Sequence, residues 1–199
     1  MTSVGFRVYT HVNRADKDIV SMFKDIPVST IDDTMNKIAA ANSSIKPINN
    51  TKLLGTAITV KAPIGDNLMF KYAIEIAQPG DIIVVDGGGC TERAICGENM
   101  VYSAKVKGIQ GFLIDGAIRD FDAISKLDDF AVFCKGVQAN SSFKGLGPGE
   151  INIPVSIGGM VVYPGDIIVG DNDGIVAIHP EDSESVALEA LRLEKQEKE

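Results

Sequence analysis

The sequence is poor in the residues that form zinc sites and disulfide frameworks. Its 199 residues include only two histidines, His11 and His179, and three cysteines, Cys90, Cys96 and Cys134. The cysteines form neither a CxxC pair nor an even set, and a structural zinc ion needs four cysteine or histidine ligands held together. We therefore expect no zinc site, and we predict that the thiols are buried as small apolar side chains in a reducing cytosol. The two histidines lie near the two ends of the chain, and we expect surface or packing roles for them.

Basic residues are also scarce. The 19 lysines and arginines stand against 27 aspartates and glutamates, which gives a formal net charge of −8. Nucleic-acid binding needs a basic surface, so this balance argues against a nucleic-acid partner. It does not exclude an anionic substrate, because a local arginine or a metal ion can reverse the field inside a pocket.

Long apolar runs are missing as well. Residues 1–18, MTSVGFRVYTHVNRADKD, lack the apolar core of a signal peptide, and no run approaches the ~18 apolar residues of a membrane span. We predict a cytoplasmic protein with no membrane partner. The segment Asp86-Gly87-Gly88-Gly89 has neither GxGxxG spacing nor the Lys-Ser/Thr pair of a P-loop. Neither a nucleotide nor a methyltransferase cofactor is therefore expected.

The sequence does contain an alternation of strand and helix patterns. Residues Ile82 to Val85 form a continuous apolar run, which is typical of a strand covered on both faces. Further strands are predicted at 54–61, 111–114, 130–134, 154–157, 160–162, 167–169 and 175–178, and helices at 16–23, 27–41, 68–77, 99–107, 121–125 and from 181 onward.

This order of elements predicts an α/β fold, with a sheet layer that carries helices on one side and a strand-rich second layer. No break in composition suggests a linker, so residues 1–199 are predicted to form one domain. It comprises N-terminal helices at about 16–41, a core at about 54–180 and a C-terminal helix at about 181–199.

Three polar segments connect these elements. Residues 86–89 are predicted to end their strand in a flexible loop, because glycine lets a backbone approach a ligand closely. Asp66-Asn67 could either line a pocket or cap the helix at 68–77, and we favour the cap. Residues 140–149 are predicted to form a polar, glycine-rich loop that is mobile or part of an interface.

A turn with free backbone amides, Gly97-Glu98-Asn99-Met100, precedes the helix at 99–107. The first N–H groups of a helix have no intrahelical partner and lie at the positive end of its dipole, which suits a carboxylate or a phosphate. The alternative is an ordinary capped helix start.

The dipeptide Arg119-Asp120 follows the strand at 111–114 and Asp115-Gly116. Ligands of α/β proteins bind beyond the carboxyl ends of the strands. An arginine can clamp a carboxylate through two hydrogen bonds, and an aspartate can bind Mg²⁺ or Mn²⁺ together with water. The alternative is a surface ion pair.

The spacing between these two motifs is more specific than either motif alone. Twenty residues separate Glu98 from Arg119, which is room for one helix and one strand that return to the same sheet edge. This pattern, in which an acidic residue is followed by twenty residues and then by Arg-Asp, resembles a known signature. It is that of the class II pyruvate aldolases of the 4-hydroxy-4-methyl-2-oxoglutarate (HMG) type, which share a fold with the regulator of ribonuclease activity A (RraA). The resemblance spans about residues 31–180. It includes Gly65-Asp66-Asn67, Pro79-Gly80-Asp81, Asp86-Gly87-Gly88-Gly89, Asp115-Gly116, Pro164-Gly165-Asp166 and Asp171-Asn172-Asp173-Gly174.

The resemblance implies a swivelling β/β/α fold and a role for each residue of the signature. The amides of Gly97, Glu98, Asn99 and Met100 would hold the substrate carboxylate, and Arg119 would bind the keto acid and stabilise an enolate. Asp120 would ligate the divalent metal, Mg²⁺ or Mn²⁺, which Glu98 would reach through bound water. That water, polarised by Glu98, is the preferred proton donor or base. Met100 departs from the usual leucine, which leaves the amides unaffected. Glu98 departs from the frequent aspartate and is one methylene longer, so the exact water network is open.

The resemblance also implies a homo-oligomer, a trimer or a dimer of trimers with pockets between subunits. An acidic residue of the neighbouring chain often completes the site in this family, and the sequence leaves Glu181, Glu184 and Glu189 as candidates.

Three functions are compatible with these observations. The leading one is a metal-dependent lyase that cleaves a short 2-keto acid to pyruvate, by aldol cleavage of HMG-like substrates and by decarboxylation of oxaloacetate, since both reactions leave a pyruvate enolate. The second is a non-catalytic protein of the RraA kind that inhibits ribonuclease E by contact. The third is an enzyme on the same scaffold with another keto-acid substrate. Arg119 beside Asp120 favours an enzyme, because a contact inhibitor does not need a metal carboxylate next to a guanidinium.

Overall fold

The computed structural model describes residues 3–143 and 147–197 of the chain. The strands are β1 (Lys46–Pro47), β2 (Leu53–Lys61), β3 (Asp81–Cys96), β4 (Gly111–Ile118), β5 (Ala131–Val137), β6 (Glu150–Ile151), β7 (Val155–Ile157), β8 (Met160–Val162), β9 (Ile167–Gly170) and β10 (Ile175–Ile178). The helices are α1 (Lys17–Met22), α2 (Val28–Thr34), α3 (Leu68–Ile76), α4 (Glu98–Val106), α5 (Phe121–Ile124) and α6 (Ser183–Glu197).

A mixed sheet in the order β1-β5-β4-β3-β2-β9-β10 forms the centre of the molecule, and β6 adds to β2. The four strands β2, β3, β4 and β5 run parallel to one another. Each pair is joined by one helix, as the alternation in the sequence predicts. The predicted α/β class is thus confirmed.

The sheet is buried on both faces. Ile83 and Val85 of β3 pack into a core beneath α3, α4 and α5, whereas Ile82 and Val84 pack into a second core with the β7–β8 hairpin. The first core includes two edge-to-face ring contacts. The centroid of the Phe112 ring lies 4.9 Å from that of Phe70 and 4.9 Å from that of Phe130. A strand buried on both faces needs apolar residues at consecutive positions, which explains the unbroken run in this strand.

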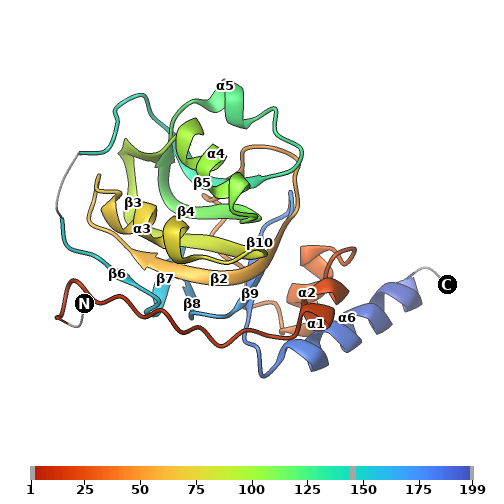
Figure 1. Ribbon diagram of the computed structural model, residues 1–199. Coiled ribbons are helices and arrows are strands. Elements are labelled where there is room, and N and C mark those ends of the chain that lie inside the picture. Colours follow the sequence, from red (N-terminus) through yellow and green to blue (C-terminus); the bar gives the residue numbers. More distant parts are fainter. Residues whose placement is uncertain (1–2, 144–146, 198–199) are drawn as a thin grey trace.

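The helices from the two ends of the chain form a separate group. Figure 1 shows α1, α2 and α6 together at one side of the molecule, away from α3, α4 and α5. A third core joins this group to β9 and β10, with Phe23, Ile31 and Ala187 among its buried members. The N-terminal arm runs along the edge of the sheet, where Val8 forms a parallel bridge with Ile151. No helix in the described ranges has the length and apolar character needed to cross a bilayer.

Strands β3 and β4 extend well beyond their predicted ends. β3 does not end at Asp86 but continues through the glycines to Cys96, with register shifts against β4. Gly88 and Gly89 have φ angles of +69° and +67°, which other residues rarely adopt, so the glycines serve bulges inside the strand and not a loop beyond it. β4 likewise continues to Ile118, so Asp115-Gly116 lie within the strand.

The second helix is shorter than predicted. It was expected to reach about residue 41, but α2 ends at Thr34. Asn36 and Lys37 follow with φ angles of 62° and 64°, and the Asp32 carboxylate accepts a hydrogen bond of 3.0 Å from the Ala39 N–H. Left-handed residues end a helix, and the aspartate holds the chain where it turns back. A short strand, β1, lies between the predicted helix at 27–41 and the predicted strand at 54–61, where no element was predicted, and it pairs with β5.

Candidate active site

The ends of β3 and β4 bring the two predicted motifs together. Cys96 and Ile118 are partners in the parallel register, and the Arg119 N–H donates a hydrogen bond of 2.9 Å to the Cys96 carbonyl. Gly97 and Arg119, the residues that follow the two strands, therefore lie side by side at the carboxyl edge of the sheet.

Asp120 is directed onto the start of α4. Its Oδ2 atom accepts a hydrogen bond of 3.0 Å from the Glu98 N–H, so a carboxylate from the next strand caps the helix. Asp120 itself has φ 61° and ψ 40°, in the left-handed region that aspartate tolerates better than most residues. Its carbonyl also accepts hydrogen bonds from the N–H groups of Ala123 and Ile124, which starts α5.

Glycine is needed at position 97 because the side chains of Arg119 and Asp120 approach its backbone closely. Its φ of −152° and ψ of −179° are extended and open to any residue. A Cβ atom at this position, however, would lie 2.5 Å from Asp120 Oδ2 and 3.1 Å from Arg119 Nε. The absence of a side chain at Gly97 therefore makes room for the carboxylate of Asp120 and the guanidinium of Arg119.

The Arg119–Asp120 pair is loose and open to solvent. Arg119 Nε lies 3.6 Å from Asp120 Oδ2, and the two side chains are 43% and 41% exposed. Among the described residues no hydrogen-bond partner engages Asp120 Oδ1, and none engages the two terminal nitrogens of Arg119. Both side chains thus keep groups with which to bind a ligand.

These groups line a pocket of about 200 Å³. Its walls come from the start of α3, the end of β3, the start of α4, the β4–α5 corner and the segment that follows β5. The lining residues are Asn67, Lys71, Ala94, Ile95, Cys96, Gly97, Asn99, Met100, Arg119, Asp120, Ser141 and Ser142.

The wall formed by Ser141 and Ser142 is tied to the sheet. The Ala94 N–H donates to the Asn140 carbonyl at 2.7 Å, and the Phe143 N–H donates to the Gly65 carbonyl at 2.7 Å. The guanidinium of Arg93 donates to the Ser141 carbonyl at 3.1 Å and lies 3.8 Å from the centre of the Phe143 ring. This part of the predicted loop at 140–149 is ordered by contacts, while residues 144–146 lie outside the described residues.

Asp66 and Asn67 have different roles: one caps a helix and the other lines the pocket. The Asp66 carboxylate accepts a hydrogen bond of 2.8 Å from the Leu68 N–H at the start of α3, which confirms the predicted cap for this residue. Asn67 instead lies in the pocket wall, where its amide donates to the Ile95 carbonyl at 3.0 Å and contacts Met100 Sδ at 3.5 Å.

The predicted site residues are not all equivalent in the structure. Gly97, Asn99, Met100, Arg119 and Asp120 line the pocket, whereas the side chain of Glu98 is exposed and outside the lining. The amides of the turn also differ. Those of Glu98 and Met100 are occupied by Asp120 and by the Gly97 carbonyl, and those of Gly97 and Asn99 have no partner within the described ranges.

Sequence reasoning missed the contribution of Lys71, Ser141 and Ser142 to the pocket. A partial signal was present for Lys71, because it lies four residues after Asn67 and so shares a helix face with it. Nothing local marked the two serines, which reach the pocket only through the pairing of Ser141 with Ala94.

The thiols near the pocket are buried. Burial raises the pKa of Cys96 far above its ordinary value and raises that of Cys134 to about 11. Cys96 and Cys134 are thus protonated packing groups, as predicted, and Cys90 is partly exposed.

The pocket offers one carboxylate to a cation. Across residues 3–143 and 147–197 no group of three or more His, Cys, Asp and Glu residues is arranged to hold a metal ion. Asp120 is the one acidic residue among those that line the pocket. This donor set does not suit zinc, but it suits Mg²⁺ or Mn²⁺, which bind through one or two carboxylates, substrate oxygens and several waters.

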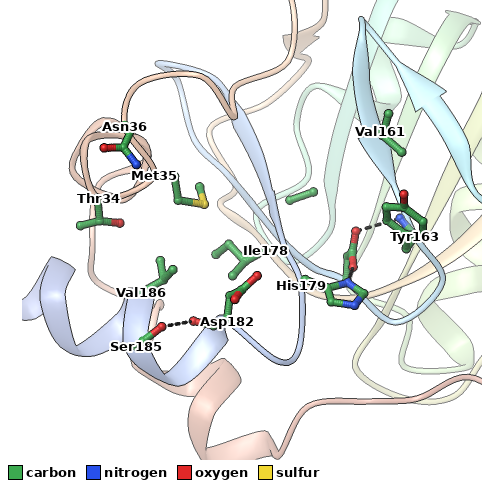
Figure 2. A pocket seen from close by; sticks show the side chains of 12 residues that line it. Thr34, Met35, Asn36, Val161, Tyr163, Ile178, His179, Asp182, Ser185 and Val186 are labelled. Atoms are coloured by element: carbon green, nitrogen blue, oxygen red, sulfur yellow. Dashed lines mark hydrogen bonds and ion pairs between the residues drawn. The ribbon is translucent and has the colours of Figure 1, made fainter.

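A larger cavity of about 800 Å³ lies elsewhere, between α2, β8, β10 and α6. Figure 2 shows His179 and Tyr163 on one side of it and Thr34, Met35 and Asn36 on the other. His179 Nδ1 bonds the buried Asp166 carboxylate at 2.8 Å, and this hydrogen bond raises the pKa of His179. Among the described residues that line this cavity there is no arginine or lysine.

Comparisons with known proteins agree with this fold. The family model described as RraA-like, Aldolase/RraA, matches residues 28–177. A relative from Halalkalibacterium halodurans is 42% identical over 91% of this chain and 86% of its own length, and it is provisionally named a 4-hydroxy-4-methyl-2-oxoglutarate aldolase.

Two solved structures are similar to the chain in fold. One, from Streptomyces coelicolor, is described as an unusual member of the RNase ES inhibitor RraA protein family; it has a TM-score of 0.81 and 24% identity, covering 93% of this chain and 97% of that one. The other is the RNA-processing inhibitor RraA from Thermus thermophilis, with a TM-score of 0.70 and 24% identity over 77% of this chain and 93% of that one.

Proposed function

The chain belongs to the RraA-like family, and on that premise we propose that it is a divalent-metal-dependent lyase that cleaves short 2-keto acids to pyruvate. The substrates would be 4-hydroxy-4-methyl-2-oxoglutarate, by aldol cleavage, and oxaloacetate, by decarboxylation. One observation carries the proposal. Arg119 and Asp120 share a pocket of about 200 Å³ with two amides at the start of α4 that have no partner among the described residues.

The environment of Asp120 fits a hard divalent cation. Oδ2 is held by the Glu98 N–H, which fixes the carboxylate, and Oδ1 has no partner in the described part of the chain. Mg²⁺ or Mn²⁺ would bind this oxygen, with Glu98 acting through water, and would supply positive charge where the keto oxygen becomes negative.

The chain's own residues would bind and orient the keto acid. The unpartnered amides of Gly97 and Asn99 suit the substrate carboxylate, because they lie at the positive end of α4. The free terminal nitrogens of Arg119 can form two hydrogen bonds to the pyruvyl oxygens. Both contacts strengthen as charge accumulates on the enolate, so they favour the transition state over the bound substrate.

Neighbouring copies of the chain would complete the site. We propose a homotrimer or a dimer of trimers, in which Glu181, Glu184 or Glu189 of one copy reaches the pocket of the next. Glu189 is already bound to Arg192 at 2.6 Å, while Glu184 is exposed in the first turn of α6. Glu184 is therefore the better candidate of the two on α6.

The alternative function is a non-catalytic regulator that binds and inhibits ribonuclease E. It is supported by the fold shared with two structures, one described as an RNA-processing inhibitor and the other as an unusual member of an RNase ES inhibitor family. Against it stands the pocket, because inhibition by surface contact would not require Gly97 to leave room for a guanidinium and a carboxylate.

Assays of pyruvate release from both substrates test the proposal. Turnover should require Mg²⁺ or Mn²⁺, stop with a chelator and return when the metal is restored. Absence of turnover, or turnover that ignores the chelator, would overturn it. Inhibition of ribonuclease E by a protein without lyase activity would establish the alternative.

A further inference from the structure

One wall of the pocket lies beyond the groups that serve the pyruvyl moiety. Asn67, Lys71, Ser141 and Ser142 form this part of the lining, and all four side chains are polar. The portion of the substrate that leaves as the second product must occupy this space. Its chemistry should therefore match a wall with hydroxyl and amide groups and one cation.

Lys71 is oriented by the helix and not by a salt bridge. Its backbone N–H donates to the Asn67 carbonyl at 3.0 Å, which places it one turn after Asn67 on the pocket side of α3. Glu75, four residues further on, would be the usual helical partner. The Glu75 carboxylate is instead bound to Lys107 Nζ at 2.8 Å, and no described residue forms an ion pair with Lys71.

The charge of the lining differs in sign from that of the whole chain. Among the described residues of the lining, Lys71 and Arg119 are positive and Asp120 is negative, a surplus of one positive charge in a protein of net charge −8. A divalent cation on Asp120 would add to this surplus. Such a pocket favours a substrate with two carboxylates over one with a single carboxylate.

We propose that Lys71 is a specificity-determining residue that binds a second carboxylate of the substrate, on the fragment that leaves. The inference rests on the proposed lyase function. It adds that Lys71 favours aldol cleavage over decarboxylation, because the two reactions treat this carboxylate differently.

In aldol cleavage of a 4-hydroxy-2-keto diacid, the C3–C4 bond breaks and its electron pair forms the pyruvate enolate. The 4-hydroxyl loses its proton as it becomes the carbonyl of the second product, and the enolate later takes up a proton at C3. The distal carboxylate stays charged throughout, so its contact with Lys71 is kept in the transition state.

Decarboxylation of oxaloacetate is different. The distal carboxylate itself departs as CO₂, and its electron pair passes into the enolate before C3 is protonated. A contact between Lys71 and this carboxylate is lost as the charge leaves, so it stabilises the bound substrate more than the transition state. Lys71 should therefore help the first reaction and slow the second.

A binding experiment tests the contact apart from turnover. In the presence of Mg²⁺, we would compare 2-oxoglutarate with 2-oxopentanoate, which has the same five-carbon chain without the second carboxylate, by calorimetry. The wild type should bind 2-oxoglutarate about tenfold more tightly. Lys71→Met should remove this preference without weakening 2-oxopentanoate, and Lys71→Arg should restore part of it. Lys24→Met, which removes an exposed charge outside the pocket, is the control and should keep the preference.

Kinetics then test the selectivity. Lys71→Met should lower kcat/KM for 4-hydroxy-4-methyl-2-oxoglutarate about tenfold, mainly through KM, and should raise kcat for oxaloacetate. An equal loss on both substrates, or an unchanged binding preference, would overturn the assignment of Lys71. A wild type that binds the diacid preferentially but turns over neither substrate would overturn the lyase function and leave the assignment of Lys71 as a carboxylate-binding residue intact.

Discussion

The Asp120 carboxylate caps the helix that begins at Glu98, through a hydrogen bond of 3.0 Å from the Glu98 N–H to Oδ2. One oxygen is thus used to join the β4–α5 corner to α4, and the other remains available to a ligand. The same contact fixes the position of the candidate metal ligand and the orientation of the amides that would bind the substrate.

Asp120→Asn separates these two roles. Asparagine tolerates the left-handed backbone and can still accept the hydrogen bond from Glu98, so we expect a loss of stability below about 1 kcal/mol. It removes the negative charge, so we expect pyruvate release from both substrates to fall by a factor of about 100 or more. Thermal unfolding and steady-state assays would measure the two effects.

Asp120→Ala should show the same loss of activity and lose about 1 kcal/mol more stability, because the cap is also gone. Full activity of either variant would mean that the metal binds elsewhere.

Gly97→Ala tests the close approach at the site. The backbone of Gly97 is extended, so alanine introduces no conformational strain, and its Cβ atom would lie 2.5 Å from Asp120 Oδ2. We expect displacement of the RD pair to lower kcat/KM about 100-fold, since a misplacement of about 1 Å has effects of that size, and to cost about 1–3 kcal/mol of stability. The matched control is Gly174→Ala, where an added Cβ meets no atom within 4 Å. Equal activity of the two variants would contradict the role given to Gly97.

Part of this site was readable from the sequence because it depends on neighbours along the chain. The twenty residues between Glu98 and Arg119 hold one helix and one strand, and the parallel register of β3 with β4 brings their ends together. The alternation of elements predicted the sheet for the same reason, since short helices between parallel strands leave few ways to pair them.

The rest depends on contacts between distant segments. Ser141 enters the pocket because it pairs with Ala94. Lys71 forms no ion pair with any described residue, since Lys107 engages Glu75, its neighbour on the helix. β3 runs on through its glycines because β4 continues beside it, although a glycine triplet by itself predicts a loop. These features depend on residues that are close in space but distant along the chain, and a single sequence does not show which residues those are.

The His179–Asp166 pair predicts a dependence of stability on pH. The hydrogen bond of 2.8 Å to Asp166 raises the pKa of His179 above its ordinary value of 6.5, with Glu181 and Asp182 acting in the same direction and desolvation opposing them. A histidine whose pKa is higher in the folded state stabilises the protein when it is charged. Its contribution is therefore fully present below the unfolded pKa, about 6.5, and is lost as the pH rises through the folded pKa.

Thermal unfolding from pH 5 to pH 9 measures this contribution. The difference in Tm between the wild type and His179→Gln should be largest at the acid end and should shrink as the pH rises. His11→Gln, which removes an exposed histidine, is the control and should show no such trend. A difference that grows with pH would contradict the sign derived from the Asp166 contact.

Arg93 should position the pocket wall without touching the reaction. Its guanidinium donates to the Ser141 carbonyl at 3.1 Å and stacks 3.8 Å from the centre of the Phe143 ring, and Arg93 is not among the residues that line the pocket. Arg93→Met keeps much of the apolar stem but loses a hydrogen bond and a cation–π contact, each worth about 0.5–1 kcal/mol at an exposed site. We expect faster hydrogen exchange in residues 140–143 and a three- to tenfold rise in KM for the keto diacids. The kcat should change little, because Arg119 and Asp120 keep their own contacts.

Phe143→Leu, which removes the stacking partner alone, should give a smaller rise in KM. A fall in kcat for either variant would show that this wall does more than hold the substrate.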